Sequence, residues 1–344
     1  MSTALFTQIF LILLAGTLLA RLWLVRRHVR HVLGHRRQVP APFRGKILLK
    51  AHRKAADYTV SKTRFAMLAG VVDTLLLLGW TLGGGLEILD QTWRAAGFGE
   101  LIAGTLFLLS AFLIMALLDL PATLYQTFVI EQRFGFNHST PALFVADLLK
   151  QALLLFVIGA PLALAALWLM QSAGTLWWFY LWLLWSGFTL LMIWAYPAVI
   201  APLFNKFTPL KNRSVQTRIQ ALLKRTGFRS RGIFVMDGSR RSAHGNAYFT
   251  GFGRNKRVVF FDTLLKTLRG PEIEAVLAHE LGHFHHRHIL KRIVMLFGMS
   301  LAGLALLGWL IQQPWFYQGL GVSTASAHAA LILFLMVGPV FTFF

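Results

Sequence analysis

The 344-residue sequence contains no cysteine, and only 13 of its residues are aspartate or glutamate. The absence of cysteine excludes disulfide bridges, iron–sulfur clusters held by thiolates, and zinc sites built from thiolates. A zinc ion bound by this chain would therefore need histidine, aspartate, glutamate or water as its ligands. Acidic ligands are absent from the last part of the sequence, because no aspartate or glutamate follows Glu280.

Charged residues make up only 14% of the sequence, whereas hydrophobic residues make up 56%. This balance is typical of a membrane protein with several spans. The net charge of +21 could suggest nucleic-acid binding, but 12 of the 34 lysines and arginines lie in residues 26–64 and 18 in residues 206–292. Basic residues grouped between apolar spans follow the positive-inside rule. We therefore expect the lipid bilayer as a partner and no nucleic acid.

The apolar stretches predict about seven transmembrane helices. The expected spans are residues 2–20, 66–86, 101–118, two within 151–205 divided near 171–174, 293–313 and 329–344. Pro121 predicts a helix end or kink after the third span. A cleaved signal peptide is the alternative for residues 2–20, but the basic cluster follows that run and does not precede it.

Alternation of these spans from the two basic segments places residues 26–64, 121–150 and 205–292 on one side of the membrane. The positive-inside rule makes that side cytoplasmic, so the N-terminus is expected outside. We divide the chain into residues 1–204 with five spans, a cytoplasmic region at 205–291, and 292–344 with two spans.

Residues 205–292 predict a small α+β region. Val215, Ile219, Leu222 and Leu223 repeat at helical spacing and predict a surface helix with a basic face. Residues 232–236 and 257–261 predict strands, and residues 246–251 with a turn at 253–255 complete an expected hairpin. A further helix is expected to begin at Gly270 and Pro271.

That last helix carries the sequence His279-Glu280-Leu281-Gly282-His283. Histidines at positions i and i+4 share one helix face, so both imidazoles can reach one zinc ion, and the glutamate can take a proton from a water there. A solvated or adventitious histidine patch is the alternative, because His285, His286 and His288 follow. A catalytic zinc site needs a third protein ligand. It must lie upstream, at Glu131 or an aspartate, or beyond residue 344.

Four segments together resemble the zinc-dependent integral-membrane CAAX prenyl proteases, a family with many bacterial members. They are Glu131–Thr140, Tyr196-Pro197 with Pro202–Phe207, His244–Gly251, and His279–His283. The resemblance implies seven helices around a water-filled chamber and a zinc ion held by His279 and His283, with Glu280 as general base. It also implies that Asn246 and Ala247 bind an extended substrate by edge-strand pairing; an ordinary sheet edge is the alternative.

The resemblance places the third ligand, a glutamate, after the seventh span, so we expect it beyond residue 344 in a C-terminally truncated sequence. Weak zinc binding and little peptidase activity are then expected of the 344-residue form. The substrates implied are prenylated CAAX-type peptides or membrane-associated proteins, and the location implied is a bacterial inner membrane. A catalytically inactive scaffold and a transporter with an adventitious histidine patch are the alternative functions.

Overall fold

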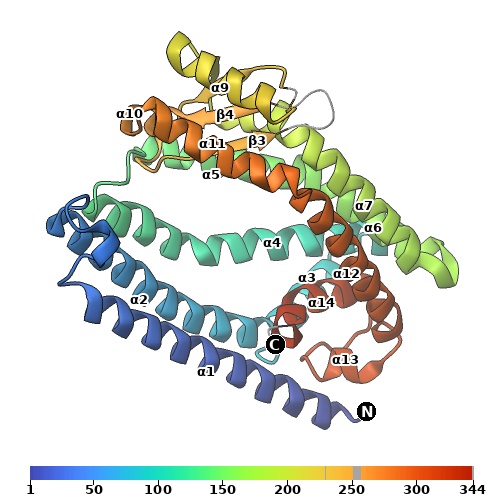
Figure 1. Ribbon diagram of the computed structural model, residues 1–344. Helices are drawn as coiled ribbons and strands as arrows, with labels where there is room; N and C mark the ends of the chain where they lie inside the picture. Colours follow the sequence, from blue (N-terminus) through green and yellow to red (C-terminus); the bar gives the residue numbers. More distant parts are fainter. Residues whose placement is uncertain (229, 251–256, 343–344) are drawn as a thin grey trace. The chain divides into compact units, whose positions relative to one another are not determined.

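The computed structural model describes residues 1–228, 230–250 and 257–342 (Figure 1). The chain forms two compact units. The first comprises Met1–Phe134, Ala152–Tyr180 and Leu304–Phe344, and the second comprises Gly135–Gln151 and Leu181–Gly303.

Long apolar helices dominate the chain. They are α1 (Thr3–His35), α2 (Leu49–Trp80), α4 (Glu100–Tyr125), α5 (Pro141–Leu154), α6 (Ala160–Ser172), α7 (Trp177–Ala195) and α12 (His288–Leu310). Wide π-helical turns extend α4 over Gln126–Glu131, join α5 to α6 over Leu155–Gly159, and join α7 to the short α8 (Ala201–Phe204) over Tyr196–Ile200. Six helical stretches of the described residues are long and apolar enough to cross a membrane, and α14 (Ala327–Phe341) is apolar but shorter. The protein is therefore an integral, multi-pass membrane protein.

The helices extend well beyond the predicted spans. The basic residues expected in a loop at 26–64 lie largely on α1 and α2, because lysine and arginine are good helix formers and charge alone does not end a helix. Pro121 lies inside α4, so the helix does not end there, and the alternative of a kink stays a prediction. The expected loop at 121–150 shrinks to a short connection between the π-helical turn and Pro141, the first residue of α5.

In the first unit, a further helix, α3 (Gly85–Ala95), lies between α2 and α4, and the short α13 (Pro314–Gln318) precedes α14. Asp90 on α3 is buried and accepts hydrogen bonds from Arg94 at 2.7 Å and from His328 of α14 at 2.5 Å. Burial would raise the pKa of Asp90, but these two partners outweigh it and hold the pKa below its usual value. Hydrogen bonds to the buried Asp90 carboxylate therefore join α3 to α14.

The second unit contains a four-stranded sheet in the order β1-β2-β4-β3. Its strands are β1 (Phe207–Pro209), β2 (Ile233–Met236), β3 (Ala247–Thr250) and β4 (Arg257–Phe261). β2 and β4 run parallel, whereas β1 with β2 and β3 with β4 are antiparallel. The predicted strands are confirmed, as is the antiparallel pairing of the hairpin; the turn predicted at 253–255 lies outside the described residues.

Two amphipathic helices pack against one face of this sheet, α9 (Arg213–Arg225) and α11 (Gly270–His285), while the short α10 (Asp262–Thr267) follows β4 (Figure 1). Strand alternation turns Ile233, Val258 and Phe260 to the same face. The helices contribute buried apolar residues at helical spacing. These are Ile219, Leu222 and Leu223 of α9 with Ile273, Leu277 and Leu281 of α11. This core fixes the rotation of α11 about its own axis.

Leu277 is 1% exposed at the centre of that core. We expect Leu277→Ala to destabilise the second unit by about 2–5 kcal/mol, because it leaves a cavity that rigid strands cannot fill. Thermal unfolding in detergent, read by protease cleavage within residues 205–285, measures the loss. Leu290→Ala is the matched control, since Leu290 is 54% exposed. Equal effects of the two substitutions would contradict the packing described.

Candidate functional site

Helix α11 presents His279 and His283 away from the sheet. Ile273, Leu277 and Leu281 lie at i, i+4 and i+8 and are buried in the core. At about 100° per residue, the two histidines occupy the opposite side of the helix. Both are exposed, whereas Glu280 lies between the two faces and is half-buried. The motif predicted from sequence therefore stands on a helix whose hydrophobic face orients it.

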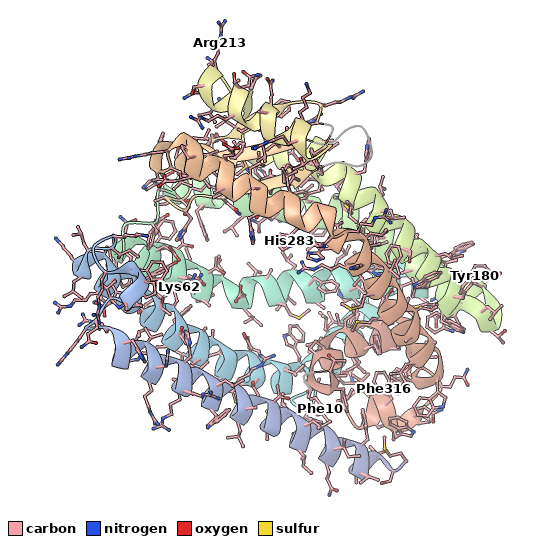
Figure 2. The ribbon with its side chains drawn as sticks, in the orientation of Figure 1. Phe10, Lys62, Tyr180, Arg213, His283 and Phe316 are labelled. Atoms are coloured by element: carbon pink, nitrogen blue, oxygen red, sulfur yellow. The ribbon has the colours of Figure 1, made fainter. Side chains whose placement is uncertain are left out.

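The two imidazoles have the spacing of a shared metal ion. Their ring centres are 5.0 Å apart, with the ring planes nearly perpendicular. Two imidazoles bound tetrahedrally to one zinc ion, at Zn–N distances of roughly 2.0–2.1 Å, have ring centres about 5 Å apart. His283 is labelled in Figure 2, near the C-terminal end of α11. The pair thus fits two positions of a zinc site.

His288 supports one of these ligands. Its Nδ1 lies 2.9 Å from Nδ1 of His283, so one ring donates a hydrogen bond to the other. Between them, Arg287 adopts a left-handed φ of 52° at the junction of α11 and α12. Histidines that bind metals usually donate their second ring N–H to a fixed acceptor. The sequence showed His288 only as part of a histidine patch, because its partner depends on the backbone turn at Arg287.

His279 and His283 are the two candidate zinc ligands that the described residues bring together. Among the residues that the structure describes, no group of three or more histidine, aspartate or glutamate side chains is placed to hold a metal ion. Glu131, the upstream alternative, accepts a 2.6 Å hydrogen bond from Tyr58 and lies 3.9 Å from Lys62. The third ligand expected beyond residue 344 stays a prediction.

A loop at residues 237–246 leads into β3 and is bound by the segment at 135–140. The backbone N–H of His138 donates to the carbonyl of Arg241, and that of Ala243 donates to the carbonyl of Phe136, each at 3.0 Å. The rings of Phe136 and His244 stack with centres 4.4 Å apart. The first of the four sequence segments that resemble the family therefore positions the third.

Arg241 binds the same loop to two more segments. Its guanidinium donates to both carboxylate oxygens of Asp147 on α5, at 2.7 and 2.9 Å, and to the side-chain oxygen of Asn205 at 2.9 Å. The carboxylate of Asp237 accepts a 2.8 Å hydrogen bond from the backbone N–H of Lys206. No sequence pattern indicates this network, because Arg241 and Asp147 are 94 residues apart.

The loop delivers Asn246 and Ala247 to the edge of the sheet. The carbonyl of Asn246 accepts a 2.9 Å hydrogen bond from the N–H of Phe261, so in the antiparallel ladder the backbone groups of Ala247 and Phe249 point to the outer side. The side-chain oxygen of Asn246 accepts from the N–H of Ala247 at 2.8 Å. Within the described residues, no strand pairs with this side of β3. Ala247 shares the hydrophobic core with Leu281, so the open edge lies beside α11.

We expect Arg241→Gln and Asp147→Asn each to destabilise the second unit by about 1–3 kcal/mol, because each removes the bidentate ion pair and leaves a half-buried charge with one weaker partner, Lys150 for Asp147 or Asn205 for Arg241. The double variant should lose less than the sum of the two. The rate of proteolysis within residues 237–246 in detergent measures both losses. Strictly additive losses would show that the pair is not coupled.

Two family descriptions match adjacent parts of the chain. "CAAX prenyl protease N-terminal, five membrane helices" matches residues 28–206, and "Peptidase family M48" matches residues 209–340. The CAAX prenyl protease 1 homolog of Oryza sativa subsp. japonica is 35% identical over 74% of this chain and 62% of its own length. The Caenorhabditis elegans homolog is 31% identical over 96% of this chain and 80% of its own length. The chain thus spans about three fifths of the rice relative.

A solved structure has the same fold. The crystal structure of S. mikatae Ste24p superposes with a TM-score of 0.89 at 26% identity, covering 98% of this chain and 82% of that one. The expected fold class, a polytopic helical membrane protein with a small α+β region, is confirmed.

Proposed function

The chain belongs to the CAAX prenyl protease family of the M48 peptidases, and we propose that it acts as a membrane-embedded zinc metalloendopeptidase. The observation that carries the proposal is the open edge of β3 beside α11, which bears His279, Glu280 and His283. An open strand edge binds extended peptide, and the adjacent helix holds the groups that hydrolyse it. The family match favours neither a transporter nor an inactive scaffold.

In this proposal, His279 and His283 bind zinc, and a third ligand comes from outside the described residues. When bound, zinc would polarise the scissile carbonyl and make an adjacent water more acidic. The Glu280 carboxylate accepts a proton from the attacking water and returns it to the leaving amine nitrogen. Because Glu280 follows His279 on the same helix, its carboxylate is held close to that water without any movement of the backbone.

The substrate main chain would pair with the outward backbone groups of Ala247 and Phe249. The side-chain oxygen of Asn246 accepts a hydrogen bond from the N–H of Ala247. A substrate carbonyl that binds this N–H must therefore displace the Asn246 side chain. Asn246 then becomes free to hydrogen-bond the substrate on the same edge. Edge pairing uses only backbone groups and therefore accepts many sequences.

The same proposal includes the substrate class, the water-filled chamber enclosed by the helices, and the orientation of the chain in the membrane. The relatives' name, CAAX prenyl protease 1 homolog, supports prenylated CAAX-type peptides, with other membrane-associated proteins as the second class. The basic segments support a cytoplasmic catalytic region with the N-terminus outside. A bacterial inner membrane and the functional division into 1–204, 205–291 and 292–344 stay predictions.

We expect Glu280→Gln to lower peptide hydrolysis by about 10²–10⁴-fold while zinc content is unchanged, because the amide cannot accept the proton. Hydrolysis of a farnesylated CAAX peptide, compared with the same peptide without the prenyl group, measures the activity and the substrate class. Glu274→Gln on the same helix is the control, since the Glu274 carboxylate forms ion pairs with Arg218 and Arg225. Retained hydrolysis by Glu280→Gln would refute its role as the base.

We expect His288→Ala to weaken zinc binding by about 10–100-fold, because His283 loses the partner that fixes its ring. His288→Asn should recover part of this affinity, since its side-chain oxygen can accept the same hydrogen bond. Competition with a chelator at constant pH measures the affinity without any need for activity. If His286→Ala weakens binding as much as His288→Ala does, the effect belongs to the whole histidine patch.

A further inference from the structure

The short helix α10 holds the residues that lead into the open edge of β3. Thr263 lies in its first turn and is buried, with 7% of its surface exposed. Its hydroxyl donates a 2.9 Å hydrogen bond to the backbone carbonyl of His244. His244 is exposed and lies two residues before Asn246, directly ahead of the edge strand. A buried hydroxyl is therefore bonded to the exposed entrance of that edge.

Gly245 brings the same backbone into close contact with α10. A Cβ atom at this position would lie 3.1 Å from Cα of Leu264 and 3.2 Å from its Cβ. Glycine permits this close approach because it has no side chain. Leu264 is buried and belongs to the core that also contains Ala247 of β3 and Leu281 of α11. Helix α10 thus contacts the entrance of the edge while it shares the core of the helix that carries the histidines.

Two further contacts hold the chain on either side of His244. The backbone N–H of Phe261, the last residue of β4, donates a 2.9 Å hydrogen bond to the carbonyl of Asn246. The Asp262 carboxylate accepts a 2.8 Å hydrogen bond from the backbone N–H of Ser239, and it also accepts one from the Ser239 hydroxyl. The end of β4 and the first turn of α10 therefore fix the path of residues 239–246.

The path of these residues matters because an edge strand binds a peptide only where its backbone groups point outward in a regular row. Glycine adopts many backbone conformations, so Gly245 cannot hold that direction by itself. The bond from Thr263 fixes the residue before this glycine, and the ladder with β4 fixes Ala247 after it. Loss of the hydroxyl would let the entrance rotate and would change the direction of the groups that meet the substrate first.

We propose that Thr263 is a positioning residue for peptide binding, which acts through the His244 carbonyl to hold the entrance of the β3 edge in its extended form. The inference rests on the proposed peptidase function. Pairing with the edge is made alike in the substrate complex and in the transition state. Loss of such uniform binding raises KM and leaves kcat unchanged.

The test compares KM and kcat for the farnesylated CAAX peptide among four variants. Thr263→Val replaces the hydroxyl by a methyl group of similar size, and we expect KM to rise about tenfold while kcat changes less than about twofold. Thr263→Ser keeps the hydroxyl and should restore KM to within about threefold of wild type. Gly245→Ala should raise KM without any change to the buried hydroxyl, because its Cβ would push the loop away from Leu264.

Thr267→Val is the matched control on the same helix. Its hydroxyl bonds within α10, to the carbonyls of Thr263 at 3.0 Å and Leu264 at 3.2 Å, so KM should change less than about twofold. Competition with a chelator should give the same zinc affinity for all four variants. Equal rises of KM in Thr263→Val and Thr267→Val, or a fall of kcat with KM unchanged, would overturn the proposal.

Hydrogen exchange of the backbone N–H groups of residues 244–250 in detergent tests the positioning without any need for activity. We expect exchange about tenfold faster in Thr263→Val and close to wild type in Thr263→Ser and Thr267→Val. Unchanged exchange in Thr263→Val would overturn the proposal. If the wild-type protein hydrolyses no peptide, the peptidase function fails, and exchange alone decides whether Thr263 positions the edge.

Discussion

The ion pair between Arg241 and Asp147 is the constraint on which the arrangement of the second unit depends. A carboxylate on the apolar helix α5 is costly unless it is paired, and both of its oxygens accept from one guanidinium. That guanidinium belongs to the loop that leads into β3, and it also holds Asn205. The loop before β3 is therefore bound to α5 through the ion pair between Arg241 and Asp147.

The hydrophobic core of the sheet also determines the chemistry of the site. Leu277 and Leu281 are buried against the strands, and the same helix must then turn His279 and His283 outward. The rotation of α11 about its own axis therefore determines both the packing of the core and the direction of the two histidines. The β3 edge shares this core through Ala247, so the base and the proposed peptide-binding strand are held by a common set of contacts.

Elements that follow from sequence patterns within a few residues were predicted correctly. The strands at 232–236 and 257–261, the start of α11 at Gly270 and the placement of the histidine motif on that helix all follow from local periodicity and helix-start residues. Helix lengths were underestimated, because hydropathy marks only the part of a helix suited to lipid. Helices α1 and α2 continue through basic segments that water or head groups can solvate.

The sequence by itself determined the membrane class, the approximate positions of the apolar helices, and the pairing of two histidines with a glutamate on one helix face. Only the tertiary structure decided the partner of Arg241, the hydrogen bond between His283 and His288, and the meeting of Arg133 with the start of α2. The reason is physical. Helix and strand periodicities are fixed by the local backbone, whereas these contacts depend on how distant segments pack.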